Sequence, residues 1–221
     1  MSKPKVRTGI VGAGFAASFH IEAARRVHGA DVDVIGVHAR TAASTQKYAD
    51  THGIAAFADL DALLEKIDVL HVCIPPALHE AVAIKALEQD VFAIVEKPLT
   101  GYFGDGTKGF DGRTASMAEA RTGALDSVSR MLAAENSSKG RILYAENWVY
   151  APTIQKEREI LEKTKGQILW MHGEEAHSGS HAPSYGHWNL AGGGAMIGKG
   201  CHPLTAALYL KGVEGRARVG K

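Results

Sequence analysis

Residues 6–17, with the sequence VRTGIVGAGFAA, decide the fold class of this chain. An apolar strand over residues 6–11 runs directly into a GxGxxA turn, and apolar side chains then recur at helical spacing over residues 16–28. A strand, a glycine turn and a helix in this order are the context in which a dinucleotide-binding fingerprint carries meaning. We therefore predict a dinucleotide-binding turn, with an ordinary strand-to-helix turn as the alternative.

Each residue of this turn has a physical reason to be there. Gly12 permits the tight bend, and Gly14 lacks a side chain, so the backbone can approach a pyrophosphate. Ala17 lets the helix pack close to the strand, while Phe15 and Ala16 lie where free N–H groups at a helix N-terminus bind an anion. We expect these five residues to contact the cofactor.

The end of the second predicted strand, residues 32–37, indicates which dinucleotide binds. NAD-selective sites usually carry an acid here for the ribose 2′-hydroxyl. This chain has the sequence HART at residues 38–41 instead. Because an arginine can pair with a 2′-phosphate, Arg40 favours NADP, with NAD as the alternative. The alternative interpretation of Arg40 is a solvated arginine at the start of a helix, which has the same sequence pattern.

A second motif follows the strand VFAIV at residues 91–95. Five apolar residues without alternation are typical of a strand buried on both faces of a parallel sheet. Glu96, Lys97 and Pro98 come next, and ligands of open α/β sheets bind beyond the carboxyl ends of the strands. Lys97 is therefore a candidate site residue; a solvated Glu-Lys pair at a strand end is the alternative. Strands and helices alternate from residue 6 to 98, which predicts a doubly wound parallel sheet.

Composition narrows the classes of protein. The 221 residues are 45% hydrophobic and 22% charged, as in soluble globular proteins. A formal net charge of +1 without a basic block argues against nucleic acid as a partner. The sequence has no long apolar run, no signal-peptide pattern and two cysteines, Cys73 and Cys201. We expect a protein of the reducing cytoplasm without membrane contact.

Four stretches together resemble the Gfo/Idh/MocA family, the glucose-fructose oxidoreductase and inositol dehydrogenase group. They are the GAGFAA turn, IPPALH at residues 74–79, EKP at residues 96–98, and the glycine run at 192–194 with GCHP at residues 200–203. The resemblance covers nearly the whole chain. It implies a Rossmann domain over residues 1–147, followed by a partial α+β domain with an open, mostly antiparallel sheet over residues 148–221. Within the second domain, residues 167–171, with the sequence QILWM, are predicted to form a strand.

The resemblance also implies site residues. Pro75 and His79 match the turn that lies along the cofactor, and Glu96 and Lys97 match the motif whose lysine faces the nicotinamide and the substrate hydroxyl. His202 matches the catalytic histidine of the family. The chemistry agrees, because an imidazole suits removal of a hydroxyl proton and an ammonium stabilises the developing alkoxide. For His202 alone, a histidine that caps a helix is the alternative.

Polar and aromatic residues late in the sequence are candidates for a sugar-like substrate pocket. We expect substrate contacts from Tyr150, Glu174, His177, His181 and Trp188. The histidines in this region fit no zinc spacing and have no cysteine pair beside them, so we predict no metal site.

Two departures from the family pattern stand out. Gly198 lies four residues before His202, where many members carry an aspartate. We expect Glu174 or Glu175 to supply the missing carboxylate, or the activity to be altered. The chain is also shorter than family members usually are, which we interpret as a C-terminal truncation that opens the edges of the second sheet.

These observations predict an NAD(P)-dependent oxidoreductase that transfers a hydride between the nicotinamide and a hydroxyl or ketone of a sugar or cyclitol. Two other functions stay open: redox-assisted glycoside cleavage, and nicotinamide binding without turnover as a sensor or partner subunit. The family also implies a homo-oligomer that assembles through the sheet of the second domain.

Overall fold

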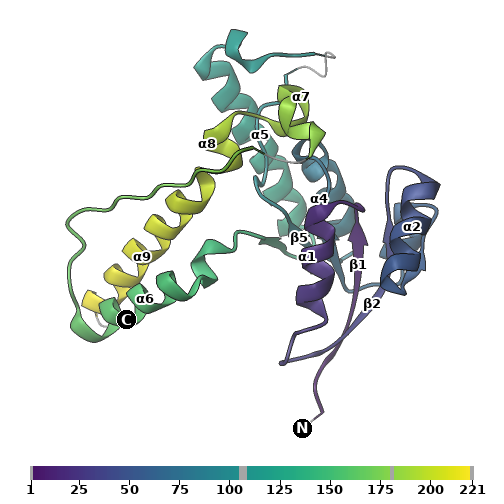
Figure 1. Ribbon diagram of the computed structural model, residues 1–221, viewed down its shortest axis with the longest axis horizontal. Coiled ribbons are helices and arrows are strands. Elements are labelled where there is room, and N and C mark those ends of the chain that lie inside the picture. The colour runs from purple at the N-terminus through teal and green to yellow at the C-terminus, as the bar shows by residue number, and fades with distance from the viewer. Residues whose placement is uncertain (1, 105–108, 180–181, 220–221) are drawn as a thin grey trace. The chain divides into compact units, whose positions relative to one another are not determined.

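The computed structural model describes residues 2–104, 109–179 and 182–219 (Figure 1). The chain divides into two compact units. One unit comprises Met1–Ala145 with His181–Gly192, and the other comprises Glu146–Ser180 with Gly193–Lys221. The domain boundary that the sequence places after residue 147 stays a prediction.

The first unit is built on one six-stranded sheet. Its strands are β1 (Lys5–Val11), β2 (Asp31–His38), β3 (Ala55–Ala56), β4 (Val69–Val72), β5 (Phe92–Val95) and β6 (Ile142–Tyr144). Their spatial order is β3-β2-β1-β4-β5-β6, and every neighbouring pair is parallel. The predicted doubly wound sheet is confirmed. The strand order reverses at β1 and β4, and ligands of such sheets bind at the carboxyl ends of the strands there.

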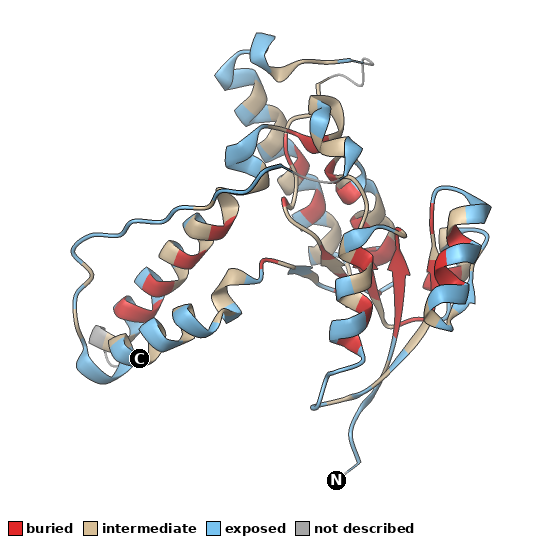
Figure 2. Ribbon diagram, in the orientation of Figure 1, coloured by how far each residue is buried: buried red, intermediate tan, exposed pale blue. Residues whose placement is uncertain are grey.

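Helices cover both faces of this sheet. The helices of this unit are α1 (Phe15–Ala24), α2 (Ala42–His52), α3 (Leu60–Leu64), α4 (His79–Leu87), α5 (Met117–Asn136) and α7 (Trp188–Ala191). Successive residues of β1 contribute to different cores: Ile10 packs with Ile21 of α1, while Val11 packs in the cluster that contains Leu63 of α3 and Ala83 of α4. Residues 8–11 of β1 are all buried, as expected where helices cover both faces of a parallel sheet. Figure 2 shows the carboxyl-terminal half of β1 as buried.

Local signals in the sequence begin and end several helices. The Thr41 side chain accepts the N–H of Ser44 at the start of α2, and Ser116 accepts the N–H of Glu119 at the start of α5. Gly53 ends α2 in the left-handed region, with φ of 65°. The Thr41 cap begins α2 directly after β2, beside the turn that leads into α1.

The second unit contains helices without a sheet among its described residues. Its main elements are η3 (Trp148–Tyr150), α6 (Pro152–Thr164), α8 (Ala195–Gly198) and α9 (Cys201–Val219). Helices α6 and α9 pack against each other. Among the described residues, no helix of either unit is both long and apolar enough to cross a bilayer.

The strand predicted at residues 167–171 is wrong, and the described residues of this unit do not show the antiparallel sheet expected for it. These residues adopt no regular secondary structure. The N–H of Ile168 donates to the Glu214 carboxylate at 3.0 Å rather than to a neighbouring strand. Leu169 and Trp170 are 87% and 78% exposed. An isolated segment cannot form a strand, because the ladder of hydrogen bonds requires a partner, and no described residue of this unit supplies one.

Candidate active site

The glycine turn joins β1 to α1 and depends on Gly12 for its shape. Gly12 has φ of 105°, and its N–H donates to the carbonyl of His38 at 2.8 Å. A Cβ on Gly12 would lie 2.1 Å from the carbonyl oxygen of Cys73. Any side chain at this position would therefore collide with the backbone that follows β4, in a conformation that favours glycine.

Gly14 has a different role, because it borders open space. A Cβ on Gly14 would meet no described atom within 4 Å, and its φ of −101° suits any residue. Among the described residues, no side chain caps the start of α1, and the first turn of α1 contains no acid. Phe15 is exposed beside it, and Ala17 is buried in the core. The start of α1 therefore offers N–H groups without a side-chain cap, the positive end of the helix dipole and room for an approaching group. These residues fit the pyrophosphate of a dinucleotide.

Arg40 lies two residues beyond β2 and is exposed. The hydrogen bond between Gly12 and His38 places the end of β2 beside the glycine turn. Ala39 is buried, and its N–H donates to the Thr45 hydroxyl at 3.0 Å. The Arg40 side chain thus begins close to the turn, where the adenosine ribose of a dinucleotide would be expected. The preference for NADP stays a prediction.

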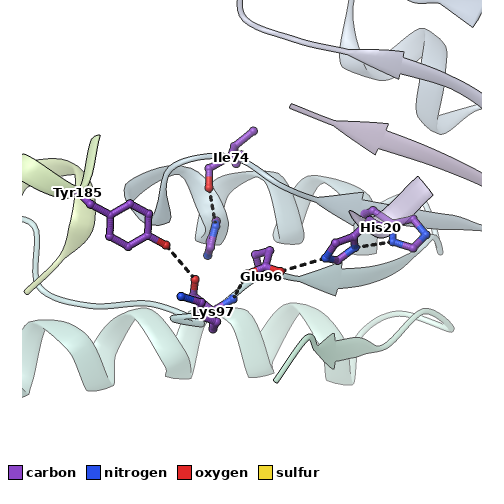
Figure 3. Close-up of polar contacts among 7 residues, drawn as sticks. His20, Ile74, Glu96, Lys97 and Tyr185 are labelled. Atoms are coloured by element: carbon purple, nitrogen blue, oxygen red, sulfur yellow. Dashed lines mark hydrogen bonds and ion pairs between the residues drawn. The ribbon is translucent and has the colours of Figure 1, made fainter. Parts of the chain in front are cut away.

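Lys97 lies beyond the end of β5, between two groups that hold its backbone (Figure 3). Its N–H donates to Oε2 of Glu96 at 3.0 Å, and its carbonyl accepts the hydroxyl of Tyr185 at 3.4 Å. The Nζ atom lies 5.7 Å from the centre of the Tyr185 ring, within the range of a cation–π interaction. Tyr185 is not predictable from the sequence, because 88 residues separate it from Lys97 and no pattern links the two.

His79 contacts the protein backbone rather than open space. Its side chain is fully buried, with Nδ1 2.9 Å from the carbonyl of Pro98 and Nε2 2.9 Å from the carbonyl of Ile74. Burial lowers the pKa of His79, although the two carbonyls act in the opposite direction. The imidazole therefore ties the turn around Pro75 to the backbone that follows Lys97. Direct contact of Pro75 and His79 with a cofactor stays a prediction.

A partly buried polar chain that the sequence does not predict lies beside Lys97. His20 of α1 contacts His71 of β4, with 2.8 Å between their Nδ1 atoms, and its Nε2 lies 3.0 Å from Oε1 of Glu96. Burial lowers the pKa of His71 to about 3, and the neighbouring His20 contributes. Burial also acts to raise the pKa of Glu96, but hydrogen bonds from His20 and Lys97 outweigh it, and the pKa is lowered. Glu96 is therefore ionised at neutral pH.

In the second unit, a buried carboxylate orients His202. The Nδ1 atom of His202 lies 2.6 Å from Oε1 of Glu146, and the Trp148 ring stacks on the imidazole at 5.6 Å between centres. The side chains of His202 and Glu146 are only 9% and 2% exposed. Oε1 of Glu146 also accepts the N–H of Trp148 at 3.0 Å, and Oε2 has no hydrogen-bond partner among the described residues.

Glu146 supplies the carboxylate that the sequence analysis sought elsewhere. The expectation that Glu174 or Glu175 partners His202 is wrong. Glu174 is exposed and lies 3.8 Å from His172. Glu146 was missed because 56 residues separate it from His202, whereas the family pattern places the acid four residues before the histidine.

The predicted substrate residues are distributed over both units. Tyr150 is 78% exposed, and His177 is exposed with its Nδ1 atom accepting the N–H of Gly179. Trp188, in the first unit, packs against the backbone of Gly112, where a Cβ would lie 2.1 Å from the indole ring. His181 lies outside the described residues. Substrate contact by these residues and by Glu174 stays a prediction.

Comparison with known proteins agrees with the fold and the turn. Residues 6–109 match the model of the GFO_IDH_MocA oxidoreductase family, which has an NAD-binding Rossmann fold. Inositol 2-dehydrogenase of Arthrobacter sp. (strain FB24) is 37% identical over 98 residues, which is 43% of this chain and 29% of that protein. The dTDP-3,4-didehydro-2,6-dideoxy-alpha-D-glucose 3-reductase of Streptomyces antibioticus is 28% identical over 222 residues, 97% of this chain and 59% of that protein.

A solved structure shares the arrangement of the elements. The crystal structure of GenD2 from gentamicin A biosynthesis, in complex with NAD, superimposes with a TM-score of 0.73 at 20% identity, over 96% of this chain and 55% of that chain. At this identity the likeness concerns the fold. The chain spans less than two thirds of the length of each of these three proteins. Residues 6–109, which contain the glycine turn and the Glu96-Lys97-Pro98 motif, thus match the Gfo/Idh/MocA oxidoreductase family that the motifs predicted.

Proposed function

We propose that this chain binds a nicotinamide dinucleotide at its glycine turn and transfers a hydride between it and a hydroxyl or ketone of a sugar-like or cyclitol substrate. The observation that carries the proposal is the open, uncapped N-terminus of α1 at Gly14. Lys97 follows a strand end at the same edge of the sheet. An anion site and an ammonium at the carboxyl edge are what a dinucleotide and a reacting oxygen require.

The proposed roles follow from the contacts of each side chain. The bound nicotinamide would supply the hydride acceptor or donor. Lys97 stabilises negative charge on the substrate oxygen, while Glu96 and Tyr185 hold its backbone in place. His202 exchanges the hydroxyl proton through Nε2, because Nδ1 faces Glu146. The buried carboxylate of Glu146 stabilises the imidazolium that forms, as in other histidine–carboxylate pairs.

Cofactor choice and substrate class belong to the same proposal. Arg40 beside the glycine turn favours NADP over NAD. The names of the two sequence relatives, one an inositol dehydrogenase and one a reductase of a dTDP-linked sugar, support a polyol or sugar nucleotide as substrate. Assembly through a sheet of the second domain stays a prediction.

A second candidate is nicotinamide binding without turnover. The exposed apolar side chains of Leu169 and Trp170 in the second unit favour it, because such groups are typical of a surface that contacts a partner subunit. The other argument for it, Gly198 in place of an aspartate, loses weight because Glu146 supplies a carboxylate to His202.

A thermal-shift titration of the chain with NADPH and with NADH tests the proposal. A ligand that binds only the folded state stabilises it by about 2.7 kcal/mol at a hundredfold excess over its dissociation constant. We expect a larger shift with NADPH. Turnover is then assayed by nicotinamide absorbance with inositols, sugars and sugar nucleotides. Binding without turnover of any of these would support the second candidate, and absence of binding would overturn both.

A further inference from the structure

A chain of polar contacts links the helix of the glycine turn to Lys97 (Figure 3). His20 lies on α1, five residues after the helix begins at Phe15. Its Nε2 atom contacts Oε1 of Glu96 at 3.0 Å, and the other carboxylate oxygen, Oε2, accepts the N–H of Lys97 at 3.0 Å. The side chains of His20 and Glu96 are 12% and 20% exposed. One imidazole and one carboxylate therefore connect α1 to the backbone of Lys97.

The donors and acceptors of this chain are determined by its chemistry. An ionised carboxylate only accepts, so Nε2 of His20 must carry a proton. The contact between the Nδ1 atoms of His20 and His71 needs one donor and one acceptor. The Nδ1 atom of His71 can be either the donor or the acceptor. It donates when His20 is neutral, and it accepts, in the other neutral tautomer of His71, when His20 is charged. The hydrogen bond from His20 to Glu96 is thus kept in both protonation states of His20.

Packing alone does not account for this arrangement. Burying polar groups costs free energy unless they are hydrogen-bonded, and apolar side chains would fill the same space between α1 and the sheet. Among the described residues, no three histidine, cysteine or acidic groups are arranged to hold a metal ion. The polar contacts that His20 makes are hydrogen bonds to His71 and Glu96.

We propose that His20 is a positioning residue that holds Glu96, and through it the backbone of Lys97, at a fixed place relative to α1. The consequence for hydride transfer rests on the proposed function, since α1 carries the dinucleotide and Lys97 serves the substrate. The positioning itself exists without any ligand and can be tested without one.

The test compares four full-length chains: the unchanged protein, His20→Leu, His20→Gln, and His28→Leu as a control on an exposed histidine after α1. Leucine removes both hydrogen bonds of His20, while glutamine retains an N–H donor that can reach Glu96. Hydrogen exchange of the backbone amides is followed by NMR without ligand. We expect the Lys97 amide to exchange about tenfold faster or more in His20→Leu, as loss of a charge-assisted hydrogen bond predicts, with β4 and β5 amides unchanged. His20→Gln should restore much of the protection.

The outcomes separate positioning from general stability. Equal exchange of the Lys97 amide in His20→Leu and His28→Leu would overturn the proposal, as would faster exchange of all β4 and β5 amides together. If His20→Leu does not fold, His20→Phe, which also lacks a hydrogen-bonding group, is compared with His20→Gln. Faster exchange of the Lys97 amide in His20→Phe alone supports the proposal, and equal exchange in the two variants overturns it. Titration of each chain with NADH and NADPH, followed by nicotinamide fluorescence, tests the proposed function separately. Failure of the unchanged chain to bind either would count against that function and not against the role of His20.

Discussion

Nδ1 of His202 lies 2.6 Å from Oε1 of Glu146, both side chains are buried, and the ring of Trp148 stacks on the imidazole. A buried imidazole held by a carboxylate has a fixed tautomer and a defined second nitrogen. Glu146 therefore places a carboxylate beside His202, although Gly198 stands where the resemblance implies an aspartate. The absence of an aspartate at Gly198 is therefore not evidence against proton transfer by His202.

Glu146→Gln is expected to lower kcat by about a hundredfold, within the range of general acid–base effects. The amide cannot stabilise an imidazolium as a carboxylate does. The dissociation constant for NADPH should remain within about twofold, because Glu146 lies outside the glycine turn. Glu157→Gln, a matched change of an exposed carboxylate on α6, is the control. An equal or larger loss in Glu157→Gln than in Glu146→Gln would overturn the assignment.

Lys97→Ala should cut turnover by about a hundredfold to a thousandfold, as removal of a group that stabilises a developing oxyanion does. Dinucleotide affinity should change little, because the pyrophosphate would contact α1. Steady-state kinetics and a binding titration measure the two effects separately. Lys66→Ala, at an exposed site, serves as the control, and unchanged turnover in Lys97→Ala would exclude the proposed role.

Gly12→Ala and Gly14→Ala should fail in different ways. Gly12→Ala combines a φ of 105° with a clash at the Cys73 carbonyl, so we expect the free energy of unfolding to fall by about 2 kcal/mol or more. Gly14→Ala places its methyl group in open space and should change stability by less than about 1 kcal/mol. The same methyl group should weaken dinucleotide binding by about tenfold. Urea unfolding and ligand titration of both variants distinguish these effects; equal affinity in Gly14→Ala and the unchanged chain would place the ligand elsewhere.

Stability should depend on pH through His71. Its pKa is about 3 in the fold against 6.5 for the free side chain, so the unfolded chain binds the extra proton first. The contribution of His71 to stability is complete above pH 6.5 and is lost as the pH falls toward 3, by about 1.4 kcal/mol per pH unit. Urea unfolding between pH 7 and pH 4 should show a shallower loss for His71→Asn than for the unchanged chain. A His28→Asn control should follow the unchanged chain, and parallel curves for all three would contradict the lowered pKa of His71.

Arg40→Asp tests the cofactor choice. An acid at this position accepts hydrogen bonds from a ribose 2′-hydroxyl and repels a 2′-phosphate. We expect the ratio of NADPH to NADH affinity to fall by about tenfold or more, since one charge-assisted contact is replaced by a repulsion. Fluorescence titrations with both dinucleotides give this ratio. An unchanged ratio would show that Arg40 does not contact the ribose.

The sequence by itself determined the parallel sheet, the glycine turn and the place of Lys97. These features depend on signals between near neighbours: unbroken apolar strands, helical spacing, and glycines at positions that need them. Gly12 illustrates the point, because the motif that identified it also predicts the backbone conformation that the structure shows. The strand predicted at residues 167–171 was wrong for the opposite reason, since its apolar composition is local but a strand forms only against a partner.

Only the tertiary structure decided which polar groups meet. Glu146 with His202, Tyr185 with Lys97, and His20 with Glu96 are pairs separated by 56, 88 and 76 residues. A single acid, tyrosine or histidine has no periodicity that marks its partner, and the free energy that favours these pairs arises only when folding removes both members from water. The strands and helices of the sheet were therefore predictable from the sequence. The partners of His202, Lys97 and Glu96 could be identified only from the folded structure.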